Sequence, residues 1–145
     1  MEKSQFESFD LQESSLVSLQ HPSLAASPDR LVVCPIAGLG VLEIKCPYNC
    51  KDVSLTAYIK KKKSFYLCAG PDGRPCLKRN HSYYYQIQFQ LLVTNRKFCD
   101  FIVWRPREFF YERIGRDEEL LTAMLPKLKA FYFDHLLPAL HAELL

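Results

Sequence analysis

The sequence predicts a mixed α/β domain in which helices flank a central sheet. Two pairs of apolar, strand-like segments indicate the sheet: residues 30–36 with 40–47, and residues 98–106 with 108–114. A long helical pattern follows from residue 117 to the C-terminus. The chain has 145 residues, 48% of them hydrophobic, which is enough for one domain with a substantial core.

The N-terminal segment is expected to differ from the rest of the chain. Residues 1–20 predict a short, weakly amphipathic helix or a loose arm, and residues 21–29 form a turn-rich connector with two prolines. We therefore expect an N-terminal arm or remnant helix at residues 1–20 and a core domain at residues 21–145.

Turn residues and capping residues predict the elements that follow the connector. The strand segments 30–36 and 40–47 are joined through Ala-Gly-Leu-Gly, which indicates a tight antiparallel hairpin. Helical spacing follows at residues 51–63, with Asp52 or Ser54 as the candidate N-cap. A second hairpin is then expected, turning at Pro-Asp-Gly.

The second half of the chain contains one ambiguous segment. The periodicity of residues 81–96 fits a strand or a helix equally well. Residues 98–106 predict a buried strand and residues 108–114 its partner. The apolar positions of the C-terminal pattern recur at intervals of three and four, which predicts an amphipathic helix, kinked or interrupted near Pro126 and Pro138.

The cysteines and the apolar segments indicate the cellular compartment in which the protein is expected. No apolar run approaches the about 20 residues of a membrane helix, and the first residues lack the pattern of a secretory signal. We expect an intracellular protein with reduced thiols and no membrane partner. A zinc site could be drawn from Cys46, Cys50, Cys68, Cys76 and His81. The last two cysteines span a hairpin, which favours packing instead.

Basic residues gather in the middle of the chain, although the net charge is only +3. Four consecutive lysines, Lys60–Lys63, are followed by Lys78 and Arg79. This stretch could follow a phosphate backbone. It also fits a solvated lysine face, and the lysine run alone favours that alternative.

Two charged residues interrupt an apolar strand segment. Side chains alternate along a strand, so Glu43 and Lys45 point to one face while Leu42 and Ile44 point to the other, packed face. A buried charge without a partner is costly, so the pair must neutralise itself, meet water or bind a ligand. A structural ion pair is the simplest alternative.

A second carboxylate enters the neighbouring strand of the same hairpin. Asp29 can approach Glu43, and with the backbone carbonyl of Ile44 the two carboxylates make an all-oxygen site suited to Mg²⁺ or Mn²⁺. Lys45 would then orient or deprotonate an attacking water, or neutralise charge that develops on a phosphate.

These residues also match a known signature. Pro28-Asp29 followed by Glu43-Ile44-Lys45 resembles the PD-(D/E)xK nucleases. The stretches "SPDRLV", "LEIKCP", "YYYQIQFQLLVT", "CDFIVW" and "ERIGRDEELLTAMLPKLKAFYFDHLLP" follow in order. Together they resemble the alkaline exonuclease family of phage lambda, also called the YqaJ viral recombinase family, and most closely its copies in animal genomes and mobile elements.

The resemblance implies a restriction-endonuclease-like core with a mixed sheet and a long C-terminal helical segment. In that core Asp29, Glu43 and the Ile44 carbonyl would hold one or two metal ions, and Lys45 would be the catalytic lysine.

The same resemblance implies that residues 82–95 are a helix. Gln86 would lie near the metal-water site and be preceded by Tyr83, and both would share one face with Gln90.

The activity implied is a magnesium-dependent DNA exonuclease that acts on linear double-stranded ends in recombination. DNA would be contacted through backbone phosphates, by Arg30, Lys60, Lys61, Lys62, Lys63, Lys78 and Arg79. A ring-shaped trimer, and a nuclear location if the chain comes from an animal genome, are further expectations. The alternative is a catalytically impaired nuclease fold that binds DNA or a protein partner.

The chain departs from the family pattern in two places. Arg30 stands where the family usually has glycine after Pro-Asp. The family's upstream helical region, which carries a further metal-proximal glutamate and holds the 5′-phosphate, has no clear counterpart; Glu2 is the candidate for that glutamate.

Overall fold

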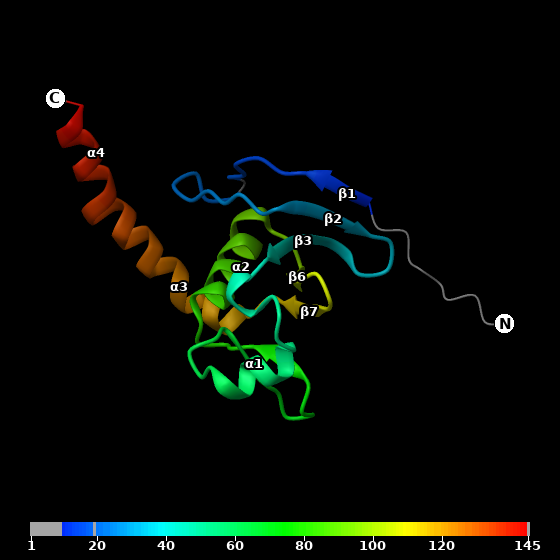
Figure 1. The fold of residues 1–145 in the computed structure, drawn as a ribbon. Coiled ribbons are helices and arrows are strands. Elements are labelled where there is room, and N and C mark those ends of the chain that lie inside the picture. Colours follow the sequence, from blue (N-terminus) through cyan, green and yellow to red (C-terminus); the bar gives the residue numbers. More distant parts are fainter. Residues whose placement is uncertain (1–9, 19, 145) are drawn as a thin grey trace.

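A computed structural model of the chain describes residues 10–18 and 20–144. Its centre is a five-stranded sheet in the order β1-β2-β3-β6-β7 (Figure 1). The strands are β1 (Asp10–Glu13), β2 (Arg30–Cys34), β3 (Gly38–Lys45), β6 (Phe98–Trp104) and β7 (Phe109–Gly115). β3 and β6 pair in parallel and the other neighbours pair antiparallel. The predicted mixed sheet is therefore confirmed.

The β2–β3 hairpin forms as predicted. Cys34 pairs with Gly38 at the turn, where Gly38 has a φ of +86°, a conformation that favours glycine. Gly40 lies under the ring of Phe98, and a Cβ at this position would come within 2.2 Å of a ring carbon. Glycine thus permits both the turn and the close contact between β3 and β6.

Within the described part of the N-terminal segment, residues 10–18, a strand forms at Asp10–Glu13. β1 pairs with β2 from Asp10 opposite Val33 to Glu13 opposite Arg30. All four residues of β1 are exposed, so their sequence carries no burial pattern that would identify a strand. Backbone pairing with the free edge of β2 stabilises β1 instead.

A small lobe follows β3 (Figure 1). It contains a 3₁₀ turn (Tyr48–Cys50), helix α1 (Leu55–Lys61) and the hairpin of β4 (Leu67–Ala69) with β5 (Pro75–Leu77). Ser54, and not Asp52, caps α1, since its side-chain oxygen accepts from the Ala57 N–H at 3.2 Å. The predicted helix and second hairpin are both confirmed.

The ambiguous segment is helix α2 (Ser82–Thr94), which lies across one face of the sheet (Figure 1). Ile87 and Leu91 belong to the hydrophobic cluster that packs against the sheet. Leu92 and Val93 belong to a second cluster, which includes residues of the C-terminal helix. Because this helix is buried on more than one side, it lacks the apolar stripe by which a helix is recognised in sequence. It ends at Asn95, with a φ of +52°.

The C-terminal helix runs as α3 (Glu118–Phe131), a π-helical segment (Tyr132–Leu136) and α4 (Leu137–Glu143), and it projects from the body (Figure 1). The helix continues through Pro126, contrary to an interruption there. The hydrogen bonding changes from α-helical to π-helical over Tyr132–Leu136, just before Pro138, which has no N–H to donate. Within the described residues no helix has the length and apolarity to cross a membrane.

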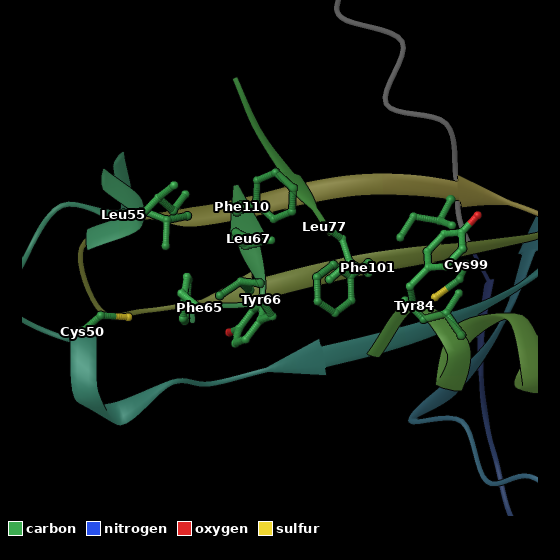
Figure 2. Packing of buried hydrophobic residues seen from close by; sticks show 14 of the residues in the cluster. Cys50, Leu55, Phe65, Tyr66, Leu67, Leu77, Tyr84, Cys99, Phe101 and Phe110 are labelled. Carbon is green, nitrogen blue, oxygen red and sulfur yellow. The ribbon is translucent and has the colours of Figure 1, made fainter. Parts of the chain in front are cut away.

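The main core lies between the sheet, α1, α2 and the β4–β5 hairpin (Figure 2). Phe101 of β6 is fully buried there, and its ring centroid lies 6.4 Å from those of Tyr66 and Phe110 (Figure 2). A smaller cluster on the opposite face of the sheet includes Val32, Cys34, Leu42 and Phe98. The sheet is therefore packed on both faces, and α2 covers only one of them.

Candidate active site

The carboxylate of Glu43 is the centre of a buried hydrogen-bond network. Its Oε1 accepts from Lys45 Nζ at 2.5 Å and from Gln86 Nε2 at 2.9 Å, and its Oε2 accepts from Gln90 Nε2 at 2.9 Å. Glu43 is only 4% exposed. One cation and two amide donors thus compensate a charge that burial alone would penalise.

The face on which these residues lie is the one that α2 covers. Alternation along β3 places Glu43 on the same side as Val41, and Val41 packs in the main core. Ile44, expected on the packed face, is instead 39% exposed. The pairing of Glu43 with Lys45 on one side is confirmed, and Leu42 on the other side is buried in the smaller cluster as expected. The sequence of β3 does not reveal that α2 packs on the side of Glu43 as well.

Lys45 lies between the carboxylate and an aromatic ring. Its Nζ is 3.5 Å from Gln86 Oε1 and 4.4 Å from the ring centroid of Tyr83. The Lys45 side chain keeps 20% of its surface exposed, compared with 5% for Glu43. The Lys45 side chain is therefore held by these contacts and remains partly exposed to solvent.

Asp29 precedes β2 and lies next to the end of β3. Its Oδ2 accepts from the Ile44 N–H at 2.7 Å. Extending the β2–β3 register by one residue beyond the pair Arg30 and Leu42 places Asp29 opposite Glu43. The N–H and C=O of a strand residue point to the same side, so the Ile44 carbonyl is directed to the side where Asp29 lies.

The donor set at this end of β3 fits a hard divalent cation. Two carboxylates and a backbone carbonyl are all oxygen ligands, which Mg²⁺ and Mn²⁺ prefer. Burial raises the pKa of the Cys99 thiol on neighbouring β6, and the charges of Glu43, Asp100 and Asp29 raise it further. Across residues 10–18 and 20–144, no three His, Cys, Asp or Glu side chains gather as a metal cluster. The Ile44 carbonyl is the candidate third oxygen ligand.

Helix α2 delivers the polar side chains that meet β3. The N-terminus of α2 is capped by His81, whose Nδ1 accepts from the Tyr83 N–H at 3.1 Å. From this cap, Tyr83, Gln86 and Gln90 follow at the i, i+3, i+7 spacing of one helix face. The predicted helix and its predicted face are confirmed.

Gln90 is a residue of this network to which the sequence assigned no role. It is 3% exposed, and its Oε1 is buried without a hydrogen-bond partner among the described residues. Its Nε2 holds the second oxygen of Glu43. The helical spacing from Gln86 was the available signal, but only the position of β3 gives the residue its partner.

Gln88, the second glutamine of the Tyr-x-x-Gln-x-Gln stretch, points elsewhere. Its Nε2 donates to the Gly115 carbonyl and its Oε1 accepts from the Asp117 N–H, both at 2.9 Å. The side chain is fully buried. Gln88 therefore fixes α2 to the junction of β7 and α3, and helps to place the glutamines that face Glu43.

The predicted DNA-binding residues have different environments. Arg30 is exposed beside the site and donates to the Asp29 carbonyl at 2.7 Å. Lys60–Lys63 are exposed at the C-terminal end of α1, and Lys78 donates to the Lys63 carbonyl. Arg79 is bonded to Glu112 at 2.7 Å and lies over the Tyr84 ring, so part of its role is structural. Glu2 lies outside the described residues.

The cysteines drawn into the alternative zinc site are spread over different environments. Cys46 is exposed, whereas Cys50 is fully buried. Cys68 and Cys76 face each other across the β4–β5 hairpin with their sulfurs 3.5 Å apart. Burial, followed by the hydrogen bond with Cys68, raises the pKa of Cys76 to about 11.

Two of the solved structures that are similar to this one are of an alkaline exonuclease. An alkaline exonuclease, LHK-Exo from Laribacter hongkongensis, has 26% sequence identity and a TM-score of 0.51, and the match covers 94% of this chain and 65% of that one. The same exonuclease in complex with dAMP gives 28% identity and a TM-score of 0.53 over the same shares. The chain thus spans 65% of the length of its structural relative. Comparison with curated protein sequences finds no match.

The sequence profile of the YqaJ-like viral recombinase domain matches residues 4–97. These residues include β2, β3 and α2, and with them every residue of the network around Glu43. The chain therefore belongs to the YqaJ-like viral recombinase family.

Proposed function

We propose that this protein is a metal-dependent DNA exonuclease that acts on the ends of linear double-stranded DNA in recombination. The convergence of Asp29, Glu43 and Lys45 at the end of β3 is the observation that carries this proposal. It is supported by the family and by two structures of one alkaline exonuclease of similar fold, one of them in complex with dAMP.

The cofactor proposed is Mg²⁺ or Mn²⁺, as one or two ions. Asp29, Glu43 and the Ile44 carbonyl would hold it, with Glu2 as a further candidate ligand. Such an ion supplies Lewis-acid polarisation of the phosphoryl group and lowers the pKa of a water molecule.

The remaining residues prepare the site for a phosphodiester. Lys45 orients the attacking water and offsets negative charge on the phosphate. Gln86 contacts both Glu43 and Lys45, so it fixes the distance between carboxylate and ammonium. The Tyr83 ring lies against the ammonium group and restricts its position.

The DNA backbone would be contacted by the exposed cations already described. Arg30 directly follows Asp29 in the chain, and Lys60–Lys63, Lys78 and Arg79 belong to the lobe and its connection to α2. Contacts with phosphates position DNA without reading its sequence. A trimer, a closest relationship to animal-genome copies and a nuclear location stay predictions.

Digestion of a linear duplex tests the proposal. The parent protein with Mg²⁺ should release nucleotides, and Asp29→Ala and Lys45→Ala should each lower the rate by about 100-fold or more. Asp72→Ala and Lys127→Ala, at positions outside the site, are the matched controls. If the two site variants digest DNA as fast as these controls, the assignment is wrong.

A second candidate is a module that binds DNA or a protein partner without cutting. It is favoured by the hydrogen bonds that the Glu43 carboxylate already accepts from Lys45, Gln86 and Gln90, because these donors compete with a metal ion for its oxygens. Calorimetry separates the two: salt-sensitive DNA binding with no uptake of Mg²⁺ or Mn²⁺ supports the binding module.

A further inference from the structure

The C-terminal helix extends beyond the body of the protein with a largely apolar surface (Figure 1). Leu128 packs against the cluster shared with α2, whereas residues 133–144 are all exposed. Four large apolar side chains of this segment are each between 40% and 57% exposed, namely Phe133, Leu136, Leu137 and Leu140. A helix that meets water is normally polar on its exposed side. This apolar surface therefore requires a partner that covers it.

The four apolar residues have the spacing of a single stripe along the helix. Counted from Phe133, they lie at i, i+3, i+4 and i+7, which is the pattern of residues that pack against one neighbouring helix. A helix of about 12–15 residues without tertiary contacts is only marginally stable in water. Packing of this apolar stripe against a second helix would stabilise the segment.

The apolar stripe is complementary to itself when two copies of the helix lie antiparallel. With a two-fold axis between Leu136 and Leu137, Leu136 of one chain lies opposite Leu137 of the second copy. Phe133 then lies opposite Leu140 of the second copy, once on each side of the axis. The same residues of both chains thus form the whole contact, as in other dimers closed by a two-fold axis.

The charges at the two ends of the apolar stripe favour this orientation. Lys129 precedes the stripe and Glu143 follows it. In the antiparallel register Lys129 lies opposite Leu144 of the second copy, one residue from its Glu143, and the two-fold axis creates this opposite-charge pair twice. A parallel register would instead place Lys129 beside Lys129 and Glu143 beside Glu143. Charges that flank an apolar contact set the orientation of paired helices in this way.

The antiparallel register also uses the free length of the helix. Residues 129–144 span about 24 Å at a rise of 1.5 Å per residue. The overlap ends next to Leu128, the residue that packs against the body. The two bodies would therefore lie at opposite ends of the helix pair and leave it room to form.

We propose that residues 129–144 bind the same segment of a second copy of this chain as an antiparallel helix pair, which makes the protein a two-fold dimer. The contact is about four helical turns long and buries less than the about 800 Å² per partner of a standard interface, so we expect a dissociation constant on the order of 1–100 μM. This dimer differs from a ring-shaped trimer, whose contacts join two different surfaces. The proposal does not depend on the nuclease function.

Sedimentation equilibrium of the intact protein tests the proposal. From about 1 to 200 μM, a range that includes the expected dissociation constant, the average mass should rise from that of one chain toward that of two. Leu137→Lys places a charge at the centre of the contact and should weaken dimerisation by about 10- to 100-fold. Because the Leu137 side chain is already 43% exposed, this substitution leaves the core intact, and circular dichroism checks the fold.

An exchange of charges tests the orientation of the two helices. Lys129→Glu and Glu143→Lys each create two like-charge contacts and should each weaken the dimer by about 3- to 30-fold. The double variant restores opposite charges at both contacts and should recover the affinity of the parent. Lys97→Glu makes the same change of net charge at an exposed residue outside the C-terminal helix. This matched control should dimerise as the parent does.

Each outcome supports or overturns the antiparallel pair. A dimer that is weakened by Leu137→Lys and by the single charge variants, and recovered in the double variant, supports it. A parent that has the mass of one chain throughout, or of three chains, overturns it. A dimer that Leu137→Lys leaves unchanged overturns it as well. Single charge variants that dimerise as the parent does, or a double variant no tighter than either, overturn the orientation. Digestion of DNA enters none of these measurements, so the nuclease assignment can fail or hold separately.

Discussion

Glu43 and Asp29 face each other across the same hairpin, yet the protein treats the two carboxylates differently. Glu43 is 4% exposed and accepts three side-chain hydrogen bonds, two of them from α2. Asp29 is exposed and accepts from one backbone N–H. Glu43 therefore joins β3 to α2 and belongs to the fold as well as to the site. Asp29, in contrast, can belong to the site without contributing to the fold.

Removing each carboxylate should separate these roles most clearly. Glu43→Ala leaves buried amide donors and an ammonium without their acceptor, so we expect the free energy of unfolding to fall by about 2–4 kcal/mol. Asp29→Ala should lower it by no more than about 1 kcal/mol. Urea unfolding of both variants measures the difference. Equal losses would show that burial does not distinguish the two residues.

Gln90 tests whether the buried carboxylate needs its helix donors. Gln90→Met keeps the approximate volume and removes the Nε2 donor, so we expect Mn²⁺ affinity to fall by about 10- to 100-fold, as for other residues that orient metal ligands. Calorimetry measures the affinity. Phe89→Leu, on the same helix turn but outside the network, is the control; a similar loss in that variant would contradict a specific role for Gln90.

The pH dependence of stability should depend on the cap of α2, which positions the Glu43 donors. Burial, followed by the charge of Lys78, lowers the pKa of His81 below its ordinary value of 6.5. The folded state thus favours neutral His81, whose Nδ1 accepts from the Tyr83 N–H. This stabilisation is complete above pH 6.5 and is lost as the pH falls through the lowered pKa.

Thermal unfolding between pH 7.5 and 5 measures this effect. His81→Asn keeps a side-chain acceptor at the N-cap and does not titrate, so its unfolding free energy should decrease less on acidification than that of the parent. An equal decrease in the unfolding free energy of both proteins would show that a group other than His81 is responsible for the pH dependence.

The smallest effect on stability is expected at the lysines outside the site. Lys61→Gln should change the free energy of unfolding by less than about 0.5 kcal/mol. If Lys61 contacts a phosphate, the slope of log affinity for duplex DNA against log salt should decrease by about 0.9. Lys127→Gln on α3 is the matched control. An unchanged slope would show that Lys61 does not contact a phosphate, which favours the alternative of a solvated lysine face.

The parts of the fold that the sequence predicted are those with local signals. The β2–β3 hairpin turns at Gly38, the β4–β5 hairpin turns at Pro71-Asp72-Gly73, and Ser54 caps α1. Each signal acts over a few residues. β1 carries no such signal, because its exposed residues are ordered by pairing with a distant strand.

The candidate site was predictable to the same extent. Alternation along β3 places Glu43 and Lys45 together, which depends on the strand alone. The identity of the covered face, and the bond from Gln90 to Glu43, depend on where α2 docks. A helix buried on several sides gives no periodicity from which that position could be read. Only the resemblance to a family identified it as a helix.

The separation of the network in sequence has a consequence for how the protein is made. Gln90 lies 47 residues after Glu43, and the lobe and most of α2 are synthesised between them. The β2–β3 hairpin can form early, but Glu43 must remain hydrated until α2 has left the ribosome and docked. A nascent chain that lacks α2 therefore also lacks the Gln86 and Gln90 donors of Glu43, and its site is incomplete.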